Sequence, residues 1–293
     1  MPPNRRLHRK ICLLGLLITL PGLLARAAQD SELQPLAGDS VLAGQLGALG
    51  MVIANEGGRG MSMGTGFLVS SCHVLTAAHV LTIPGEHVKL GATLRFFPEG
   101  GSKRPFFERA VLGHVVAAGA DFVMTENPGL FDLPGIAQDW ALIELEQSLP
   151  AVEPFKLLAP GLPIPGNSTF SIVGYPAQGH GERLQAQEHC ANRSNVHGNQ
   201  ALPGLVLVDC AVRAGMSGGP LLIDGGNPPV AAGIIVERFE FGQKVLTMAV
   251  PSSAFAEQIN TAMRNSDLCA VGHPFVFPPA AGGKEASHAN AAE

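Results

Sequence analysis

Aromatic and charged residues are both scarce in this chain. Phe, Trp and Tyr make up 5% of the 293 residues, and Asp, Glu, Lys and Arg make up 15%. The sequence has no Cys-x-x-Cys pair and no His-Glu-x-x-His segment, two spacings that are typical of zinc ligands. It also has no basic amphipathic segment of the kind that holds a protein on an anionic membrane. We therefore expect no metal, no cofactor and no stable membrane association.

Glycine and proline, in contrast, are abundant, with 36 and 23 residues. Hydrophobic residues make up 46% of the chain, which is enough for a core. They occur mostly in short runs separated by turn residues, a pattern that is typical of strands rather than of long helices. The composition therefore favours an all-β fold.

The first 27 residues have the pattern of a secretory signal peptide. Four basic residues precede the apolar run 11–20, and Ala25-Arg26-Ala27 offers small residues for cleavage. An uncleaved membrane anchor is the alternative, but about 14 apolar residues are short of the roughly 20 that span a bilayer. We therefore expect an exported protein, periplasmic or extracellular.

Removal of residues 1–27 makes the chain more acidic. It takes away five basic residues and no acidic one, so that 14 basic and 24 acidic residues remain, a net charge near −10. A surface of this sign repels phosphate backbones. Nucleic acid is therefore not an expected partner.

The rest of the chain divides at a proline-rich stretch. Residues 28–46 are polar or small and are typical of a linker or a short pro-segment. Five prolines in residues 148–166 mark the best domain boundary. We expect strands of an N-terminal barrel in 47–150 and of a C-terminal barrel in 151–268, with one helix at 252–264 that Ser252 or Ser253 caps. Residues 269–293 are of low complexity and are expected to be disordered.

Four cysteines remain after the predicted signal peptide: Cys72, Cys190, Cys210 and Cys269. An even number in an exported chain indicates disulfides, and four cysteines allow three pairings. We prefer Cys190 with Cys210, which would close a loop of about 20 residues. Cys72 with Cys269 then follows by elimination. The alternative is that these two stay free, with Cys72 a small core residue.

Three short segments carry the residue types that together can activate a serine. They are Thr76-Ala77-Ala78-His79, Asp139-Trp140-Ala141-Leu142-Ile143 and Gly215-Met216-Ser217-Gly218-Gly219-Pro220. A serine hydroxyl becomes an effective nucleophile when an imidazole accepts its proton and a carboxylate orients that imidazole. Each segment alone could be an ordinary turn or strand, but His, Asp and Ser, 60 and 78 residues apart, together favour catalysis.

The α/β-hydrolases are the main competing class, because Gly215, Ser217 and Gly219 also fit their Gly-x-Ser-x-Gly nucleophile elbow. In those enzymes the histidine follows the serine. Here only His273 and His288 follow Ser217, and both lie in the tail. The order of the residues therefore argues against an α/β-hydrolase.

Together with Gly64-Thr65-Gly66-Phe67-Leu68-Val69, the three segments resemble the signature segments of trypsin-like (chymotrypsin-fold) serine proteases. The secreted bacterial branch is the most similar, and the resemblance covers about residues 47–264. It implies two six-stranded antiparallel β-barrels (chymotrypsin-like) with a C-terminal helix, and a site in the cleft between the barrels.

The resemblance also implies a role for each reacting residue. His79 is the general base and later the general acid, Asp139 fixes its tautomer, and Ser217 attacks the carbonyl. The backbone N–H groups of Gly215 and Ser217 form the oxyanion hole. The implied protein is a monomeric serine-type endopeptidase that acts on proteins or peptides. The alternatives are a catalytically silent trypsin-like binding module and an esterase on the same fold.

Met216 marks a departure from the digestive enzymes of this family. Those enzymes carry an Asp before the nucleophile, and this Asp pairs with a freshly cut N-terminus. A thioether cannot form that ion pair. We therefore expect activity that does not depend on a new α-amino group, whichever residue between 28 and 46 begins the chain.

The expected specificity pocket also departs from trypsin. Ala211 stands where trypsin-type specificity uses an Asp, and Val212 adds no charge, so small or apolar side chains should fit. Ile235, Val236 and Glu237 complete the expected substrate-binding residues, and Val236 to Arg238 would pair with substrate backbone as an added strand. Alternatively, Glu237 or Glu240 near the mouth would recruit a basic residue.

Overall fold

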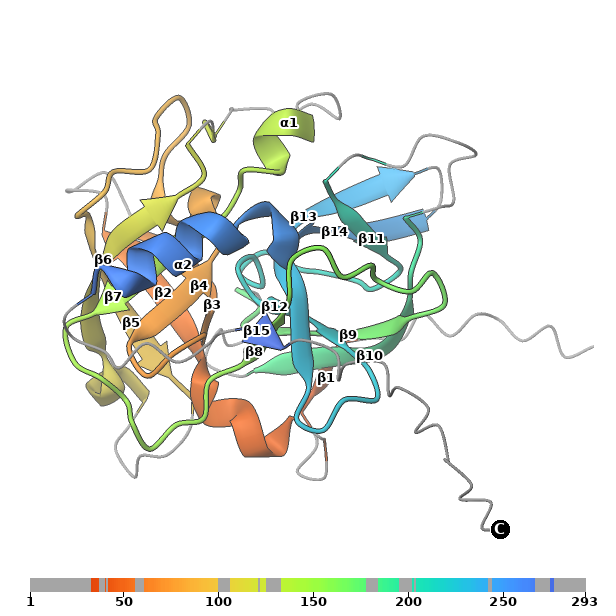
Figure 1. Cartoon of the computed structure of the whole chain (residues 1–293), viewed down its shortest axis with the longest axis horizontal. Coiled ribbons are helices and arrows are strands. Elements are labelled where there is room, and N and C mark those ends of the chain that lie inside the picture. The colour runs from red at the N-terminus through yellow and green to blue at the C-terminus, as the bar shows by residue number, and fades with distance from the viewer. Residues whose placement is uncertain are drawn as a thin grey trace, which may run out of the picture. The chain divides into compact units, whose positions relative to one another are not determined.

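The computed structural model describes a two-part β structure (Figure 1). The described residues are 33–36, 40, 42–55, 61–99, 106–120, 122–124, 133–177, 184–194, 202, 204–241, 244–266 and 275–276. The predicted signal peptide lies outside them. In the part of the chain that the structure describes, no helix is long and apolar enough to cross a membrane.

The first barrel contains six antiparallel strands and is closed, as the sequence predicts. The strands are β2 (Leu49–Asn55), β3 (Met61–Leu68), β4 (His73–Thr76), β5 (Thr93–Pro98), β6 (Val111–Ala118) and β7 (Ala141–Leu145). Around the barrel they follow the order β2-β3-β4-β7-β6-β5, and β5 pairs with β2. Large side chains such as Phe67, Phe96 and Leu142 are fully buried inside. Their removal from water is the main stabilising contribution to the barrel.

The second half of the chain forms a curled sheet rather than a second closed barrel. Its strands are β1 (Gln34–Pro35), β8 (Lys156–Leu158), β9 (Thr169–Gly174), β10 (Gln185–Ala191), β11 (Val206–Val208), β12 (Pro220–Ile223), β13 (Val230–Phe241), β14 (Lys244–Pro251) and β15 (Phe275–Val276). Neighbouring strands pair in the order β1-β10-β9-β12-β13-β14-β11, and β8 pairs in parallel with β13 and with β15. The expectation of two six-stranded barrels therefore needs correction for the second one.

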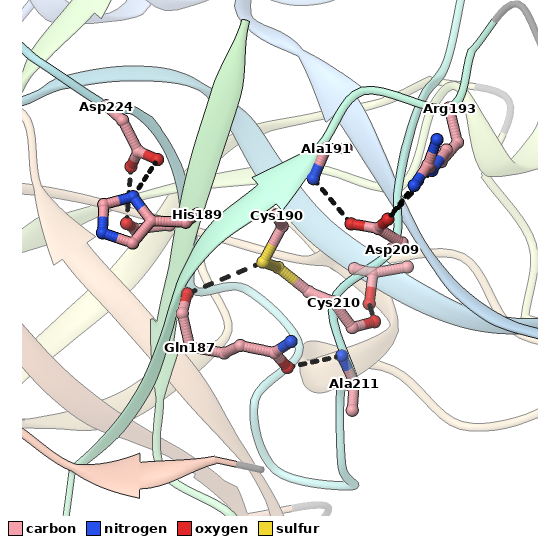
Figure 2. The surroundings of a disulfide bond; sticks show 11 residues. Gln187, His189, Cys190, Ala191, Arg193, Asp209, Cys210, Ala211 and Asp224 are labelled. Atoms are coloured by element: carbon pink, nitrogen blue, oxygen red, sulfur yellow. Dashed lines mark hydrogen bonds and ion pairs between the residues drawn. A yellow bond between two sulfur atoms is a disulfide. The ribbon is translucent and has the colours of Figure 1, made fainter. Parts of the chain in front are cut away.

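A seam joins the two ends of this sheet. A single β-bridge, between Asn192 and Val208, joins the β10 side to β11 in the described residues, and Arg193 N–H donates to Leu207 O beside it at 2.7 Å. A disulfide between Cys190 in β10 and Cys210, just after β11, crosses the same seam (Figure 2). β11 has three residues, and the disulfide adds a covalent link to the few hydrogen bonds that cross this seam.

The C-terminal helix α2 (Ala256–Arg264) follows a 3-10 turn and packs against β6 of the first barrel. Ile259 and Met263 face the core, as its apolar spacing predicts. The predicted serine cap is wrong, because the cap position is Phe255 and the hydroxyl of Ser252 donates to Leu158 O at 2.6 Å. A short helix α1 (Leu133–Ile136) precedes the Asp139 segment.

Two segments that the sequence analysis placed outside the barrels are partly integrated into the fold. In the expected linker 28–46, β1 pairs with β10, and Leu33 and Leu42 are buried. In the expected disordered tail 269–293, β15 pairs with β8. Two-residue strands such as β1 and β15 are too short for a recognisable period, so their pairing is decided by the sheet edges they meet.

Candidate active site

The pairing of β4 with β7 brings His79 and Asp139 together. Thr76, the last residue of β4, lies opposite Ala141, the first residue of β7. In an antiparallel pair the residues that follow one strand leave the barrel beside those that precede the other. His79, three residues after Thr76, and Asp139, two residues before Ala141, therefore emerge at the same end of the barrel.

Asp139 contacts His79 at two points. Its Oδ2 lies 2.7 Å from the ring Nδ1, and its Oδ1 accepts the backbone N–H of His79 at 2.9 Å. Asp139 itself is 5% exposed. The carboxylate thus fixes both the ring and the backbone that carries it. With Nδ1–H donating to Asp139, Nε2 is the acceptor nitrogen of the neutral ring.

The charge around His79 favours its protonated form. Burial of the ring has the largest single effect and lowers its pKa, but the charge and hydrogen bond of Asp139 and the charge of Glu237 together raise the pKa above 6.5. A base with a raised pKa accepts a proton more readily at neutral pH. The site can therefore take a proton from a neighbouring hydroxyl and hold it.

Ser217 lies in the loop between β11 and β12, and both barrels fix its backbone. Its carbonyl oxygen accepts the N–H of Thr65 in β3 at 2.8 Å, and the next N–H, of Gly218, donates to Ile235 O in β13 at 2.8 Å. Gly218 has φ +86°, and a Cβ there would lie 2.1 Å from Thr65 O. Only glycine fits this close approach, which explains the Ser-Gly-Gly sequence.

In the segment 215–219, two backbone N–H groups have no acceptor in the described residues: those of Gly215 and Ser217. The carbonyl oxygens of the same peptide groups are engaged, because Ala177 N–H donates to Ala214 O at 2.7 Å and Gly219 N–H donates to Met216 O at 3.0 Å. In a trans peptide the N–H points opposite to the C=O. Each of the two N–H groups therefore points away from these contacts and can bind an oxyanion.

A pocket of about 450 Å³ opens beside these groups. Its lining residues are His79, Val212, Arg213, Ala214, Ser217, Val236, Glu237 and Arg238. The predicted base and nucleophile thus face one cavity. Of the five expected substrate-binding residues, Val212, Val236 and Glu237 line it.

Ala211 and Ile235 do not belong to that lining. Ile235 is fully buried in the core of the second sheet, because a bulge shifts the register between Ile235 and Glu237. Strict alternation would place these two side chains on one face, and the extra residue of the bulge separates them. Nothing in a single strand sequence indicates such a bulge. The side chain of Glu240 lies outside the described residues.

Sequence reasoning missed two pocket residues, Arg213 and Ala214, and expected Arg238 only as part of the segment that pairs with substrate backbone. Arg213 and Ala214 continue the wall that begins at Val212, so their proximity to Ser217 in the sequence was the available signal. The two arginines give the pocket both signs of charge, together with Glu237.

Three contacts hold the segment that leads to this wall. Cys210 is bonded to Cys190, the pairing that the sequence analysis preferred. Gln187 accepts the N–H of Ala211 on Oε1 at 2.7 Å, as Figure 2 shows. The buried hydroxyl of Thr247 donates to Cys210 O at 2.8 Å. The wall therefore begins at a rigid point.

Cys72, His73 and Glu144 place three potential metal-ligand atoms within 4.8 Å of one another. Cys72 is buried and disulfide-bonded, which excludes the alternative of a free thiol there. A disulfide sulfur is not a thiolate ligand, so this group does not fit a metal site. Cys269, the predicted partner of Cys72, lies outside the described residues.

Comparisons with known proteins bear on the fold and on the family. Comparison with curated proteins finds no match. Solved structures that are similar include "GrC", with a TM-score of 0.54 at 16% identity over 80% of this chain and 99% of that one. A thermostable serine protease, AL20, from an extremophilic microorganism has a TM-score of 0.54 at 17% identity over 75% of this chain and 99% of that one. A Glu endopeptidase in complex with MPD has a TM-score of 0.54 at 16% identity over 80% and 97%.

At these identities the similar structures show the fold alone, which is that of chymotrypsin-like serine proteases. The family evidence comes from the sequence. The family model of the trypsin-like peptidase domain matches residues 64–228, more than half of the chain, and this range includes His79, Asp139 and Ser217. The chain therefore belongs to the trypsin-like peptidase domain family.

Proposed function

We propose that the protein is an exported serine endopeptidase of the secreted bacterial type, which cleaves peptide bonds through an acyl-enzyme. The observation that carries this proposal is the two-point contact of Asp139 with His79, combined with a single pocket that both His79 and Ser217 line. A binding module has no need for a carboxylate that fixes the tautomer of a pocket histidine.

In the first step, Oγ of Ser217 attacks the carbonyl carbon of the scissile bond. Nε2 of His79 takes the hydroxyl proton, and Asp139 stabilises the imidazolium that results. The former carbonyl oxygen becomes an oxyanion, which the N–H groups of Gly215 and Ser217 bind. The tetrahedral intermediate then collapses, the C–N bond breaks, and His79 gives its proton to the leaving amine.

In the second step, water replaces the amine. His79 removes a proton from the water as its oxygen attacks the acyl carbon, and the same N–H groups bind the new oxyanion. When this intermediate collapses, the ester bond to Ser217 breaks and His79 returns the proton to Oγ. The acid is released and the enzyme is restored.

The pocket favours small or apolar side chains at the residue before the cut. Val212 and Val236 are apolar, and Glu237 is accompanied by Arg213 and Arg238, so the lining does not present one dominant charge. A panel of peptides that differ only at this residue tests the proposal. We expect Ala, Val or Leu to be preferred, and a strong preference for Arg, Lys or Glu would contradict it.

Labelling with a fluorophosphonate probe tests the catalytic assignment. The wild-type protein should react, whereas Ser217→Ala and His79→Ala should not, although both variants remain folded by circular dichroism. Failure of the folded wild-type protein to react would favour the silent binding module. Reaction with the probe and with p-nitrophenyl acetate, but no cleavage of a denatured protein or a peptide library, would favour the esterase.

Export is supported by the basic head, apolar run and small residues of positions 1–27. Expression of the full chain in a bacterial host tests this part of the proposal. Protein recovered from the periplasm or medium should begin just after residue 27, and an intact N-terminus in the membrane fraction would favour the uncleaved anchor.

A further inference from the structure

Thr65 belongs to the first barrel but contacts the nucleophile loop of the second. It lies in β3 and is fully buried. It does not line the pocket, and no step of the proposed mechanism uses it. Its contacts nevertheless reach both residues whose N–H groups are proposed to bind the oxyanion, Gly215 and Ser217.

The side chain of Thr65 bridges two backbone groups. Its Oγ1 donates to Gly215 O at 2.9 Å and accepts the N–H of Tyr175 at 2.9 Å. A hydroxyl has one hydrogen to donate. Because the hydroxyl oxygen accepts the Tyr175 N–H, its own hydrogen is directed to Gly215 O. The backbone N–H of Thr65 donates to Ser217 O at 2.8 Å. A second buried hydroxyl, of Thr76, donates to Thr65 O at 2.7 Å and holds this backbone in place.

These contacts determine how the peptide groups on either side of Gly215 are oriented. Gly215 has φ +90° and no side chain, so its two peptide groups would otherwise rotate at small cost. The group before it is fixed because Ala177 N–H binds Ala214 O at 2.7 Å, and the group after it is fixed because Thr65 binds Gly215 O. The direction of the Gly215 N–H is therefore set from both sides.

We propose that Thr65 is a positioning residue that holds the Gly215 N–H in the direction needed to bind the oxyanion. This inference rests on the proposed protease function. It predicts that loss of the Thr65 hydroxyl slows acylation of Ser217, while the response of the rate to pH, which His79 and Asp139 determine, stays unchanged.

Thr65→Val is the decisive variant because valine keeps the shape and loses the hydroxyl. A methyl group cannot approach Gly215 O and Tyr175 N at hydrogen-bond distance, so the loop must shift. Thr65→Ser restores the hydroxyl and is the rescue. Thr65→Ala leaves a space where valine would place a methyl group, and it replaces Thr65→Val as the variant without a hydroxyl if the valine variant does not fold. Ser252→Ala is the matched control, since it also removes a buried hydroxyl that donates to a backbone carbonyl, Leu158 O.

The measurement is the acylation rate per active site with p-nitrophenyl acetate, across pH, after burst titration of the active sites. We expect Thr65→Val to lower the plateau rate by about 10- to 100-fold, the range that a small misplacement of a catalytic group produces, with the same pH midpoint. Thr65→Ser and Ser252→Ala should stay within about threefold of the wild type, well below the loss expected for a displaced donor.

Three outcomes separate the possibilities. The inference is supported if acylation is slow in Thr65→Val, or in Thr65→Ala in its place, and is restored in Thr65→Ser. The inference is overturned if the variant without the hydroxyl acylates each active site as fast as the wild type. It is also overturned if Ser252→Ala loses as much rate as that variant, because any lost buried hydroxyl would then slow the enzyme. If the folded wild type itself forms no acyl-enzyme, the proposed function fails and the inference fails with it.

Discussion

Replacement of Gly215 by alanine tests the proposed oxyanion hole most directly. Gly215 has φ +90°, which an alanine adopts only with strain of about 1–2 kcal/mol. An ideal Cβ at this position would also lie 2.4 Å from Tyr175 O and 2.8 Å from Ala177 N, both backbone atoms. Because Tyr175, which directly follows β9, is fully buried, the loop of Gly215 must move instead, and the Gly215 N–H moves with it.

The expected loss of activity follows from the number of donors. With one of two oxyanion donors displaced, kcat should fall by about 10²- to 10³-fold, which corresponds to about 2.7–4 kcal/mol of transition-state stabilisation. KM should change little, since a ground-state carbonyl interacts weakly with these N–H groups. The strain also lowers the free energy of unfolding.

Gly225→Ala provides the matched control. Gly225 has φ +85°, but nothing lies within 4 Å of its Cβ position. Its variant therefore carries the same backbone strain without the collision. Kinetics with p-nitrophenyl acetate and thermal unfolding of both variants would separate the two effects. Equal kcat values in the two variants, after correction for active-site count, would refute the assignment of Gly215.

Three further predictions concern pH, the disulfide and the N-terminus. The rate should fall as pH drops through the raised pKa of His79, because catalysis needs the neutral ring; Glu237→Gln removes a charge that raises this pKa and should move the midpoint of the kcat/KM profile to lower pH. A profile that does not move would contradict this role of Glu237. Replacement of Cys190 and Cys210 by alanine opens a loop with a sequence separation of 20 and should lower the free energy of unfolding by about 3 kcal/mol in urea titrations. Fluorophosphonate labelling should persist, because Gln187 and Thr247 still hold the pocket wall, and complete loss of labelling would count against that reasoning. Chains that begin at residues 28, 30 or 32, all before the buried Leu33, should cleave at equal rates; a strong dependence on the first residue would mean that a new α-amino group takes part despite Met216.

Much of the site was predictable because its chemistry resides in short segments. His79, Asp139 and Ser217 are each flanked by neighbours that constrain the local backbone, and their order excluded the α/β-hydrolase alternative. The pairing of Cys190 with Cys210 was also predictable, from an even count and a short loop. Local sequence carries such information because a reacting group needs particular neighbours in the chain as well as in space.

The pocket lining was less predictable. The sequence suggested Ile235 beside Val236 and Glu237, but a bulge in β13 turns Ile235 into the core. Arg213 and Arg238 also line the pocket. A one-residue register shift leaves no mark on composition or alternation, so side-chain direction at such a point depends on the neighbouring strands.

The sequence by itself determined the family, the all-β architecture and the three residues that carry the proposed chemistry. Only the tertiary structure decided that the second sheet is curled rather than closed, with the disulfide across its seam, and that Thr65 of the first barrel contacts the loop of Ser217. Residues 65 and 215 are 150 positions apart in the sequence. Contacts over such a separation depend on how two sheets pack, which no local pattern specifies.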